Sequence, residues 1–141
     1  MIGNTVTIVG NLTSDPELRF TNSGKAVASL SVAFNRRWKD GQGNDQEETS
    51  FFDVTAWESL GENAAASLSK GDRVMVEGRL LQRSWETPEG DKRTKIEIHA
   101  DEIGPCLKWA TARPSRNEKP AGGGNAPSWP TRQQAFNEEP F

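Results

Sequence analysis

The chain has few of the side chains that build covalent cross-links or metal sites. Its 141 residues include one cysteine, Cys106, and one histidine, His99. A single cysteine excludes an intramolecular disulfide, and one cysteine with one histidine falls short of a zinc ligand set. We expect Cys106 to be a small apolar side chain near the end of the folded domain. We therefore expect no metal ion and no other cofactor.

Long apolar runs and catalytic motifs are also absent from the sequence. No stretch approaches the roughly 20 apolar residues of a membrane-spanning helix, and the first residues lack the regions of a signal peptide. No second imidazole accompanies His99, and Gly122–Gly124 does not join an expected strand to a helix as a phosphate-binding loop would. We expect a soluble cytoplasmic protein with no catalytic residues and no enzyme activity.

Apolar residues are scarce for a fully packed globule, at 33% of the chain with a mean hydropathy of -0.74. The formal net charge of -3 at first disfavours an anionic partner. The placement of charges matters more than their sum, however. We expect the acidic stretch Asp45–Glu48 to form a cluster that lies apart from the basic residues.

The composition divides the chain into three parts. From about Thr111 onward, Pro114, Pro120, Gly122–Gly124, Pro127 and Pro130 mark a stretch that cannot bury enough surface to fold. We expect a folded domain over residues 1–110, a disordered Pro/Gly-rich linker over 111–136, and an acidic tip over 137–141.

Alternating apolar and polar residues predict strands over most of the folded part. The expected strands are 5–10, 26–34, 51–57, 73–85 and 95–99, with a further extended stretch at 17–20. Residues 62–68 contain good helix formers, and Lys70-Gly71 supplies a helix end. This order fits an all-β, five-stranded Greek-key barrel of the OB-fold type with one short helix, followed by a disordered C-terminal tail.

Large rings occur where a core would not place them. Strand side chains alternate between faces, so Phe51, Asp53, Thr55 and Trp57 share one face, while Phe52 shares the apolar face of that strand. We therefore expect the rings of Phe51 and Trp57 to point away from the core. The same alternation carries Arg83 and Trp85 onto the face of Arg73 and Arg79.

Exposed rings interleaved with cations are what a protein needs to stack unpaired bases and neutralise the phosphates between them. The candidate stacking residues are Trp38, Phe51, Trp57 and Trp85. The candidate phosphate-binding residues, expected on one sheet face and its loops, are Arg36, Arg37, Lys39, Arg73, Arg79, Arg83, Lys92, Arg93 and Lys95.

Residues 1–107 and the last few residues resemble bacterial single-stranded DNA-binding proteins. The resemblance rests on these segments: Val9–Leu12, Asp15–Arg19, Trp38, Phe51–Trp57, Lys70–Asp72, Val74–Gly78 and Trp85. Better-studied members carry Trp at the position of Phe51 and Phe at that of Trp57, so both positions stay aromatic here.

The resemblance implies sequence-independent binding and protection of single-stranded DNA in replication, recombination and repair, in the nucleoid. It implies a homotetramer, and base stacking on the four rings named above. It also implies that replication and repair proteins dock on the C-terminal tip, formed here by Glu138, Glu139, Pro140 and Phe141. This acidic run is shorter than that of the family and made of Glu rather than Asp.

Several interpretations stay open at the level of sequence. The domain could be an OB adaptor in a replication-restart complex with little DNA binding of its own, as the acidic net charge weakly favours. Trp57 and Phe51 could pack in a core or a subunit interface, and Trp38 could be a packing cap. The C-terminal tip could serve only solubility, or it could compete with DNA for the basic groove. We expect Phe20, Phe34 and Phe52 in the core, and we assign Trp109 and Trp129 no base contact.

Overall fold

The computed structural model describes residues 3–118 of the chain. Six strands and one helix follow one another along this part. Their bounds are β1 (Val6–Leu12), β2 (Glu17–Phe20), β3 (Ala26–Lys39), β4 (Asp45–Trp57), α1 (Glu58–Ser67), β5 (Arg73–Glu86) and β6 (Lys92–Pro105). Residues 106–118 contain no helix or strand.

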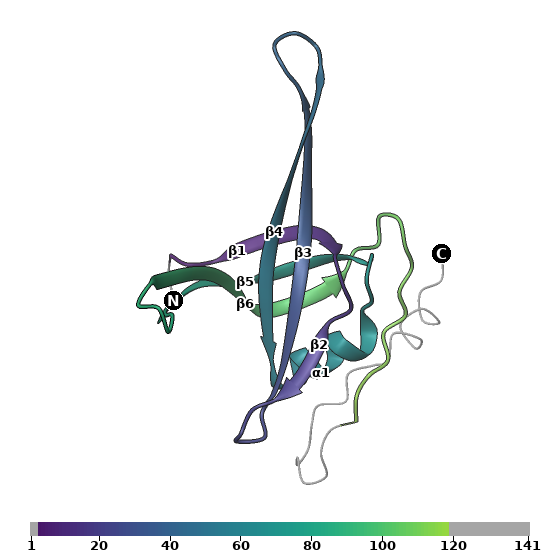
Figure 1. The fold of residues 1–141 in the computed structure, drawn as a ribbon. Coiled ribbons are helices and arrows are strands. Elements are labelled where there is room, and N and C mark those ends of the chain that lie inside the picture. Colours follow the sequence, from purple (N-terminus) through teal and green to yellow (C-terminus); the bar gives the residue numbers. More distant parts are fainter. Residues whose placement is uncertain (1–2, 119–141) are drawn as a thin grey trace, which may run out of the picture.

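The strands close into a barrel (Figure 1). Their order is β1-β5-β6-β4-β3-β2, and β1 also pairs with β3, so five strands close the barrel and β2 adds to the edge of β3. All pairings are antiparallel except β4 with β6, where Val54 lies opposite Ile98. The prediction of a five-stranded OB-fold barrel with one short helix is confirmed. The expected C-terminal tail beyond residue 118 lies outside the described residues.

Apolar residues at alternate strand positions fill the barrel. Buried members include Leu30, Val32, Val54 and Val76, each 3% exposed or less. From α1 and the residue after it, Ala64 and Leu68 join the same cluster, so the helix closes the lower end of the barrel in Figure 1. These residues supply the hydrophobic stabilisation that fixes the strand register.

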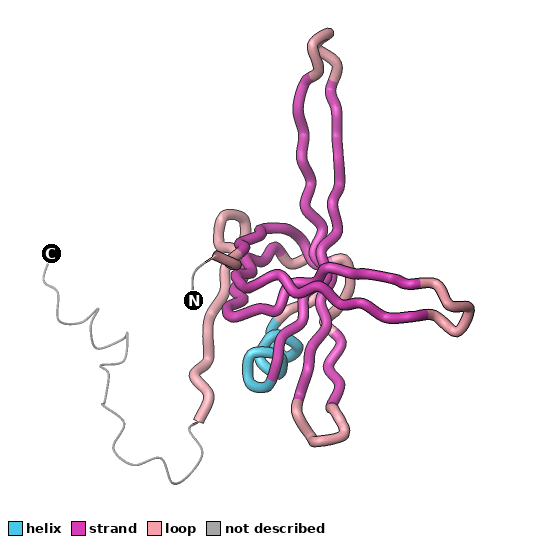
Figure 2. The backbone as a smooth tube through the Cα atoms, turned by 90° about the vertical axis from the view of Figure 1, so that its left-hand side faces the viewer, coloured by secondary structure: helices cyan, strands magenta, loops and turns pink. Residues whose placement is uncertain are grey.

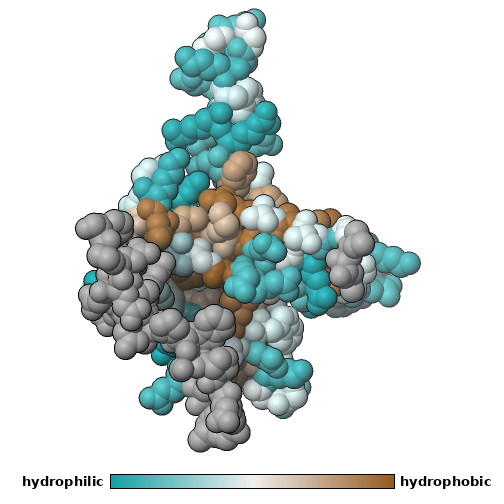
Figure 3. Space-filling view, turned by 180° about the vertical axis from the view of Figure 1, so that it is seen from behind, coloured by the Kyte–Doolittle hydropathy of each residue, from teal (hydrophilic) through white to brown (hydrophobic). Residues whose placement is uncertain are grey.

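Three hairpins extend beyond the closed barrel in different directions (Figure 2). The longest is formed by β3 and β4, joined by residues 40–44, where Gly43 has φ 80°, a conformation that favours glycine. This arm is hydrophilic over most of its length, whereas hydrophobic surface gathers on the barrel below it (Figure 3). Within residues 3–118, no helix is long and apolar enough to span a membrane.

The expected placement of two rings in the core is wrong. Phe20 is 63% exposed because it ends the short edge strand β2, which lies outside the barrel closure. Phe34 is 43% exposed because it lies where β3 leaves the barrel and no opposite wall covers it. Phe52 is half-buried and packs against the core, as expected.

Candidate nucleic-acid interface

The solvent side of β4, β5 and β6, here called the outer face, carries three of the four predicted stacking rings. Phe51 is 67%, Trp57 41% and Trp85 48% exposed. Phe52, Val54 and Ala56 turn the other way into the barrel, which confirms the predicted alternation. The large exposure of these rings means that folding of the single chain leaves them free to contact a partner.

Trp38 lies on the other side of the β3–β4 arm. Its register partner is Gln46, whereas Phe51 lies opposite Ala33. Opposed residues of an antiparallel pair share a face, and neighbours along a strand alternate, so Trp38 and Phe51 point to opposite faces. The guanidinium of Arg36 lies 4.7 Å from the centre of the Trp38 ring. The structure therefore does not bring all four rings onto one face.

The predicted cations are divided in the same way. On the outer face Arg83 lies opposite Lys95, and Trp85 lies opposite Arg93, so cations and a ring alternate there. Arg79 belongs to the same face of β5, because it follows the same alternation as Arg83. Within residues 3–118, the predicted cations without a carboxylate partner at 4.0 Å or less are Lys39, Arg73, Arg79, Lys92 and Arg93.

The acidic stretch does not lie apart from the basic residues. Residues 45–48 belong to β4, where Glu48 lies opposite Arg36 and Glu47 opposite Arg37. Their nearest charged atoms are 4.0 Å and 3.7 Å apart, and all four side chains are more than half exposed. Such exposed pairs contribute about 0–1 kcal/mol. The expectation of a segregated cluster is wrong because the strand pairing of the arm places acids and bases side by side.

Arg73 has a partner of a different kind. Its guanidinium lies 4.7 Å from the centre of the Trp109 ring, and the ammonium of Lys108 lies 5.1 Å from the same ring. The ring holds Arg73 at the end of β5 that is far from Trp85. Trp109 itself is 71% exposed.

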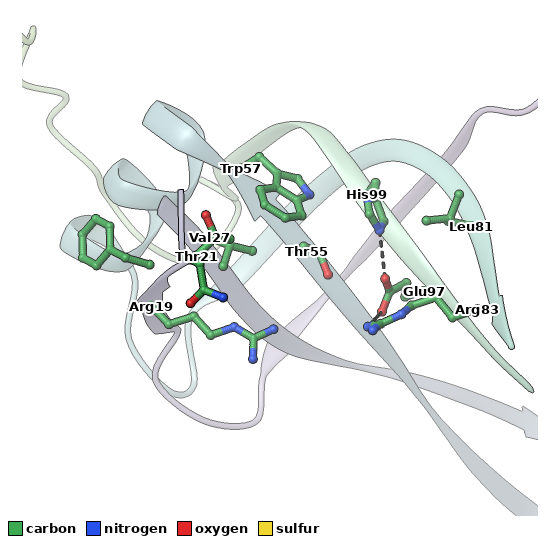
Figure 4. Close-up of a pocket in the computed structure, with 11 residues that line it drawn as sticks. Arg19, Thr21, Val27, Thr55, Trp57, Leu81, Arg83, Glu97 and His99 are labelled. Atoms are coloured by element: carbon green, nitrogen blue, oxygen red, sulfur yellow. Dashed lines mark hydrogen bonds and ion pairs between the residues drawn. The ribbon is translucent and has the colours of Figure 1, made fainter. Parts of the chain in front are cut away.

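A pocket opens on the outer face beside Trp57 (Figure 4). Figure 4 shows Glu97 between His99 and Arg83. A carboxylate oxygen of Glu97 lies 2.9 Å from Nε2 of His99, and its other oxygen lies 3.7 Å from the Arg83 guanidinium. The rings of Trp57 and His99 are 6.5 Å apart between centres. This pocket therefore combines the ring of Trp57 with a buried, charge-paired carboxylate.

Four charged or aromatic residues of this pocket were missed by the reasoning from sequence: Arg19, Phe20, Glu97 and His99. One signal was available, because alternation along residues 95–99 places Lys95, Glu97 and His99 on one face. Nothing local to residues 19 and 20 indicates that β2 reaches this face. Among the described residues, no group of three or more potential ligands is placed to hold a metal ion.

Comparisons with known proteins give the chain its family. Residues 3–106 match the model of the single-strand binding protein family. The chain belongs to this family. A single-stranded DNA-binding protein of Paenarthrobacter aurescens is 52% identical over 117 residues, covering 82% of this chain and 68% of the relative. That of Mycobacterium tuberculosis strain H37Rv is 46% identical over 147 residues, covering 97% and 86%.

Solved structures of family members share the fold. A deletion mutant of the single-stranded DNA binding protein from Thermus aquaticus is 30% identical with a TM-score of 0.66, covering 75% of this chain and 51% of that chain. The Plasmodium falciparum SSB in complex with ssDNA has a TM-score of 0.70 at 23% identity, covering 75% and 97%. The resemblance inferred from the sequence is confirmed at the level of the family.

Two sets of predicted features lie outside the described residues. They are the linker beyond residue 118 and the tip residues Glu138, Glu139, Pro140 and Phe141. Cys106 is partly buried beside the end of β6, and its backbone N–H donates to the carbonyl of Arg73.

Proposed function

We propose that this chain binds single-stranded DNA without regard to base sequence. Bases stack on Phe51, Trp57 and Trp85 of the outer face and on Trp38 of the arm. The phosphates between them are neutralised by Arg36, Arg37, Lys39, Arg73, Arg79, Arg83, Lys92, Arg93 and Lys95. The observation that carries the proposal is the presence of three exposed rings on one face, with the cations Arg83, Arg93 and Lys95 around Trp85 on the same face.

The chemistry of stacking explains the lack of sequence preference. Every base has a π-face, and stacking does not read the hydrogen-bonding edges. In single-stranded nucleic-acid-binding proteins, each stacked base is worth about 1–3 kcal/mol by alanine substitution, so four rings supply a large part of the affinity. Duplex DNA binds poorly because its bases are already stacked on one another.

Family membership supports three further parts of the proposal. The chain protects single-stranded DNA during replication, recombination and repair, and it assembles as a homotetramer. Its tip, Glu138 to Phe141, recruits replication and repair proteins: a terminal ring and carboxylate after two acids suit an apolar pocket rimmed by Lys or Arg. Deleting the tip is expected to abolish pull-down of such proteins and to leave DNA affinity unchanged or higher.

The DNA-binding part is tested by titrating tryptophan fluorescence with oligo-dT at two salt concentrations. We expect quenching, and an affinity that falls with salt by about 0.7 in log K against log salt for each phosphate neutralised. The Trp85→Ala variant is expected to bind about 5- to 150-fold more weakly. Leu107→Ala serves as a control, because Leu107 is 65% exposed but lies beyond the outer face strands.

The same titration separates this function from that of an adaptor with an OB fold. An adaptor would show no quenching and no shift in electrophoretic mobility at low salt. Its affinity for DNA, if any, would be unchanged in a Trp38→Ala/Trp85→Ala double variant.

A further inference from the structure

Strand β4 passes into helix α1 without a connecting residue. The strand ends at Trp57, and the helix begins at Glu58. Trp57 keeps extended backbone angles, with φ -103° and ψ 146°, whereas Glu58 has φ 57°. Within residues 3–118, Glu58 is the only residue other than glycine with a positive φ. The change of direction between strand and helix is therefore made at one residue, directly after a ring that is proposed to stack a base.

The side chain of Glu58 does not account for this conformation. A left-handed backbone brings the Cβ atom of an L-amino acid close to the following carbonyl oxygen, which costs free energy. Glycine avoids this cost, and Asn or Asp offsets it through local hydrogen bonds of a short polar side chain. Glu58 has a longer side chain, is exposed, and has no cationic group within 4.0 Å of its carboxylate among residues 3–118. The positive φ must therefore come from the packing on either side of it.

Close packing of α1 on the barrel provides one of these constraints. A Cβ atom at Gly61 would overlap the carbonyl oxygen of Ala56 and would lie 3.1 Å from the backbone nitrogen of Ala28. Ala56 and Ala28 are register partners, and both are fully buried. The first turn of α1 thus lies directly on the backbone of the strand end that carries Trp57. The chain reaches this position because it turns sharply at Glu58.

The barrel strands hold Trp57 from the other direction. Its backbone pairs with that of Val27 in β3, at the last position of β4. The centre of its ring lies 6.5 Å from that of His99 in β6, with an angle of 37° between the ring planes (Figure 4). The Trp57 side chain is 41% exposed, so part of the ring stays open to a partner. Its position is therefore set by the strand on one side and by the turn at Glu58 on the other.

We propose that Glu58 is a positioning residue for DNA binding, because its left-handed backbone holds the ring of Trp57 in the orientation that stacks a base. The proposal rests on the function proposed above and deepens it. A binding group that is already fixed in its bound orientation loses less freedom when the ligand arrives, and this raises affinity. The contribution comes from the backbone at position 58 and not from the carboxylate. Residues that tolerate a positive φ can therefore replace Glu58, whereas β-branched residues cannot.

The proposal is tested with three uncharged residues at position 58, so that all variants share one net charge. Glu58→Gln keeps the length of the side chain and is the reference. Glu58→Asn tolerates a positive φ and is expected to bind oligo-dT as the reference does. Glu58→Val places a β-branched side chain where φ is positive, which is strongly disfavoured. We expect it to bind about 5- to 30-fold more weakly than the reference, in the lower part of the range for loss of one stacked base.

A second background separates positioning of Trp57 from a general effect on the barrel. In a chain that already carries Trp57→Ala, Glu58→Val is expected to change the affinity by less than about 2-fold relative to Glu58→Gln, because no ring is left to position. A loss of the same size in both backgrounds would overturn the proposal. Ser59→Val is the matched control, since Ser59 is the next exposed residue of the same turn and has no positive φ. We expect it to bind as the unsubstituted chain does, and melting curves set a temperature at which every variant is folded.

A measurement without DNA follows the ring itself. The indole N–H signal of Trp57 in the NMR spectrum, assigned by its loss in Trp57→Ala, is expected to keep its chemical shift in Glu58→Asn. It is expected to move in Glu58→Thr, a polar β-branched variant that suits an exposed site if Glu58→Val does not fold. An unmoved signal in Glu58→Thr, or equal DNA affinity of Glu58→Val and Glu58→Gln, would overturn the positioning role alone. Absence of oligo-dT binding by the unsubstituted chain would overturn the proposed function together with it.

Discussion

The ammonium nitrogen of Lys95 lies 3.0 Å from a carboxylate oxygen of Asp53. Asp53 stands between Phe51 and Trp57 on the same side of β4, so a negative charge lies within the proposed DNA path. Both side chains are about half exposed, at 46% and 52%. A pair of this kind contributes little to folding, about 0–1 kcal/mol. Its main effect is to occupy a cation that would otherwise be free for a phosphate.

We therefore expect Asp53→Asn to tighten binding of single-stranded DNA. The substitution removes the acid from the path and frees Lys95 to contact a phosphate. Log K against log salt is expected to become steeper by about 0.7, the contribution of one additional phosphate on a single strand. Oligo-dT titrations at several salt concentrations measure this slope.

The matched control is Glu62→Gln, which changes the net charge equally but lies on α1. An equal gain in both variants would show that overall charge, rather than release of Lys95, determines the affinity. Unchanged affinity in Asp53→Asn would place the DNA away from this pair.

Burial of Glu97 predicts a loss of stability when its carboxylate is removed. Glu97 is 6% exposed, and its carboxylate is bonded to His99 and paired with Arg83. We expect Glu97→Ala to lower the free energy of unfolding by about 1–3 kcal/mol, because His99 loses a buried hydrogen-bond partner. The larger cost of an isolated buried charge does not apply, since Arg83 is exposed enough to be hydrated.

Urea unfolding followed by fluorescence measures this difference. Glu86→Ala, at an exposed position of the same hairpin, is expected to stay within about 0.5 kcal/mol of the unsubstituted chain. Equal stability of the two variants would contradict a structural role for the Glu97–His99 hydrogen bond.

Close approach of β5 and β6 makes Gly78 another sensitive position. A Cβ atom at Gly78 would overlap the backbone carbonyl oxygen of His99. The strands would have to separate beside the pocket, so Gly78→Ala is expected to destabilise the domain by about 1–3 kcal/mol or more, as overpacking does. The register irregularity between Glu77 and Gly78 lies at the same point.

Gly104 provides the comparison, because a Cβ there meets nothing within 4 Å. Gly104→Ala is expected to be neutral or to stabilise by up to about 1 kcal/mol, through reduced freedom of the unfolded chain. Chemical denaturation of both variants measures their free energies of unfolding. Equal stability of the Gly78→Ala and Gly104→Ala variants would mean that β5 and β6 can separate at Gly78 at no cost.

The sequence predicts the barrel well because its signal is local. Alternation along residues 51–57 separates core from solvent within a single strand, and the structure follows it through Val54 and Ala56. The β3–β4 arm lacks this signal. Beyond the barrel both faces of this two-stranded ribbon meet solvent, so polar residues lie on both faces. Pairing between the two backbones holds the strands together as far as Lys39 and Asp45.

Features that depend on pairing between strands could not be predicted in the same way. The face of Trp38 follows from its register against Gln46, which no local pattern specifies. Phe20 and Phe34 have apolar side chains, but their burial depends on whether another wall covers them. The pocket draws on β2 through β6, so only the closed fold brings Arg19 near Glu97.

The turn of the long arm depends on one carboxylate, and this gives a prediction for pH. Asp40 accepts hydrogen bonds from the backbone N–H groups of Asn44 and Gln42, each at 2.9 Å. These bonds, that of Asn44 first, favour the ionised carboxylate and hold the pKa of Asp40 below its ordinary value. Because the folded pKa is depressed, the stabilisation of the turn is present above the ordinary aspartate pKa and is lost as pH falls through the folded value. We expect NMR titration to show that the pKa of the Asp40 carboxyl lies below the ordinary aspartate value, and that the amide signals of Gln42 and Asn44 shift over the same pH range. Asp40→Ala is expected to remove both amide shifts and to increase hydrogen exchange in the turn, whereas an Asp40 midpoint at the ordinary aspartate value would contradict the bonding.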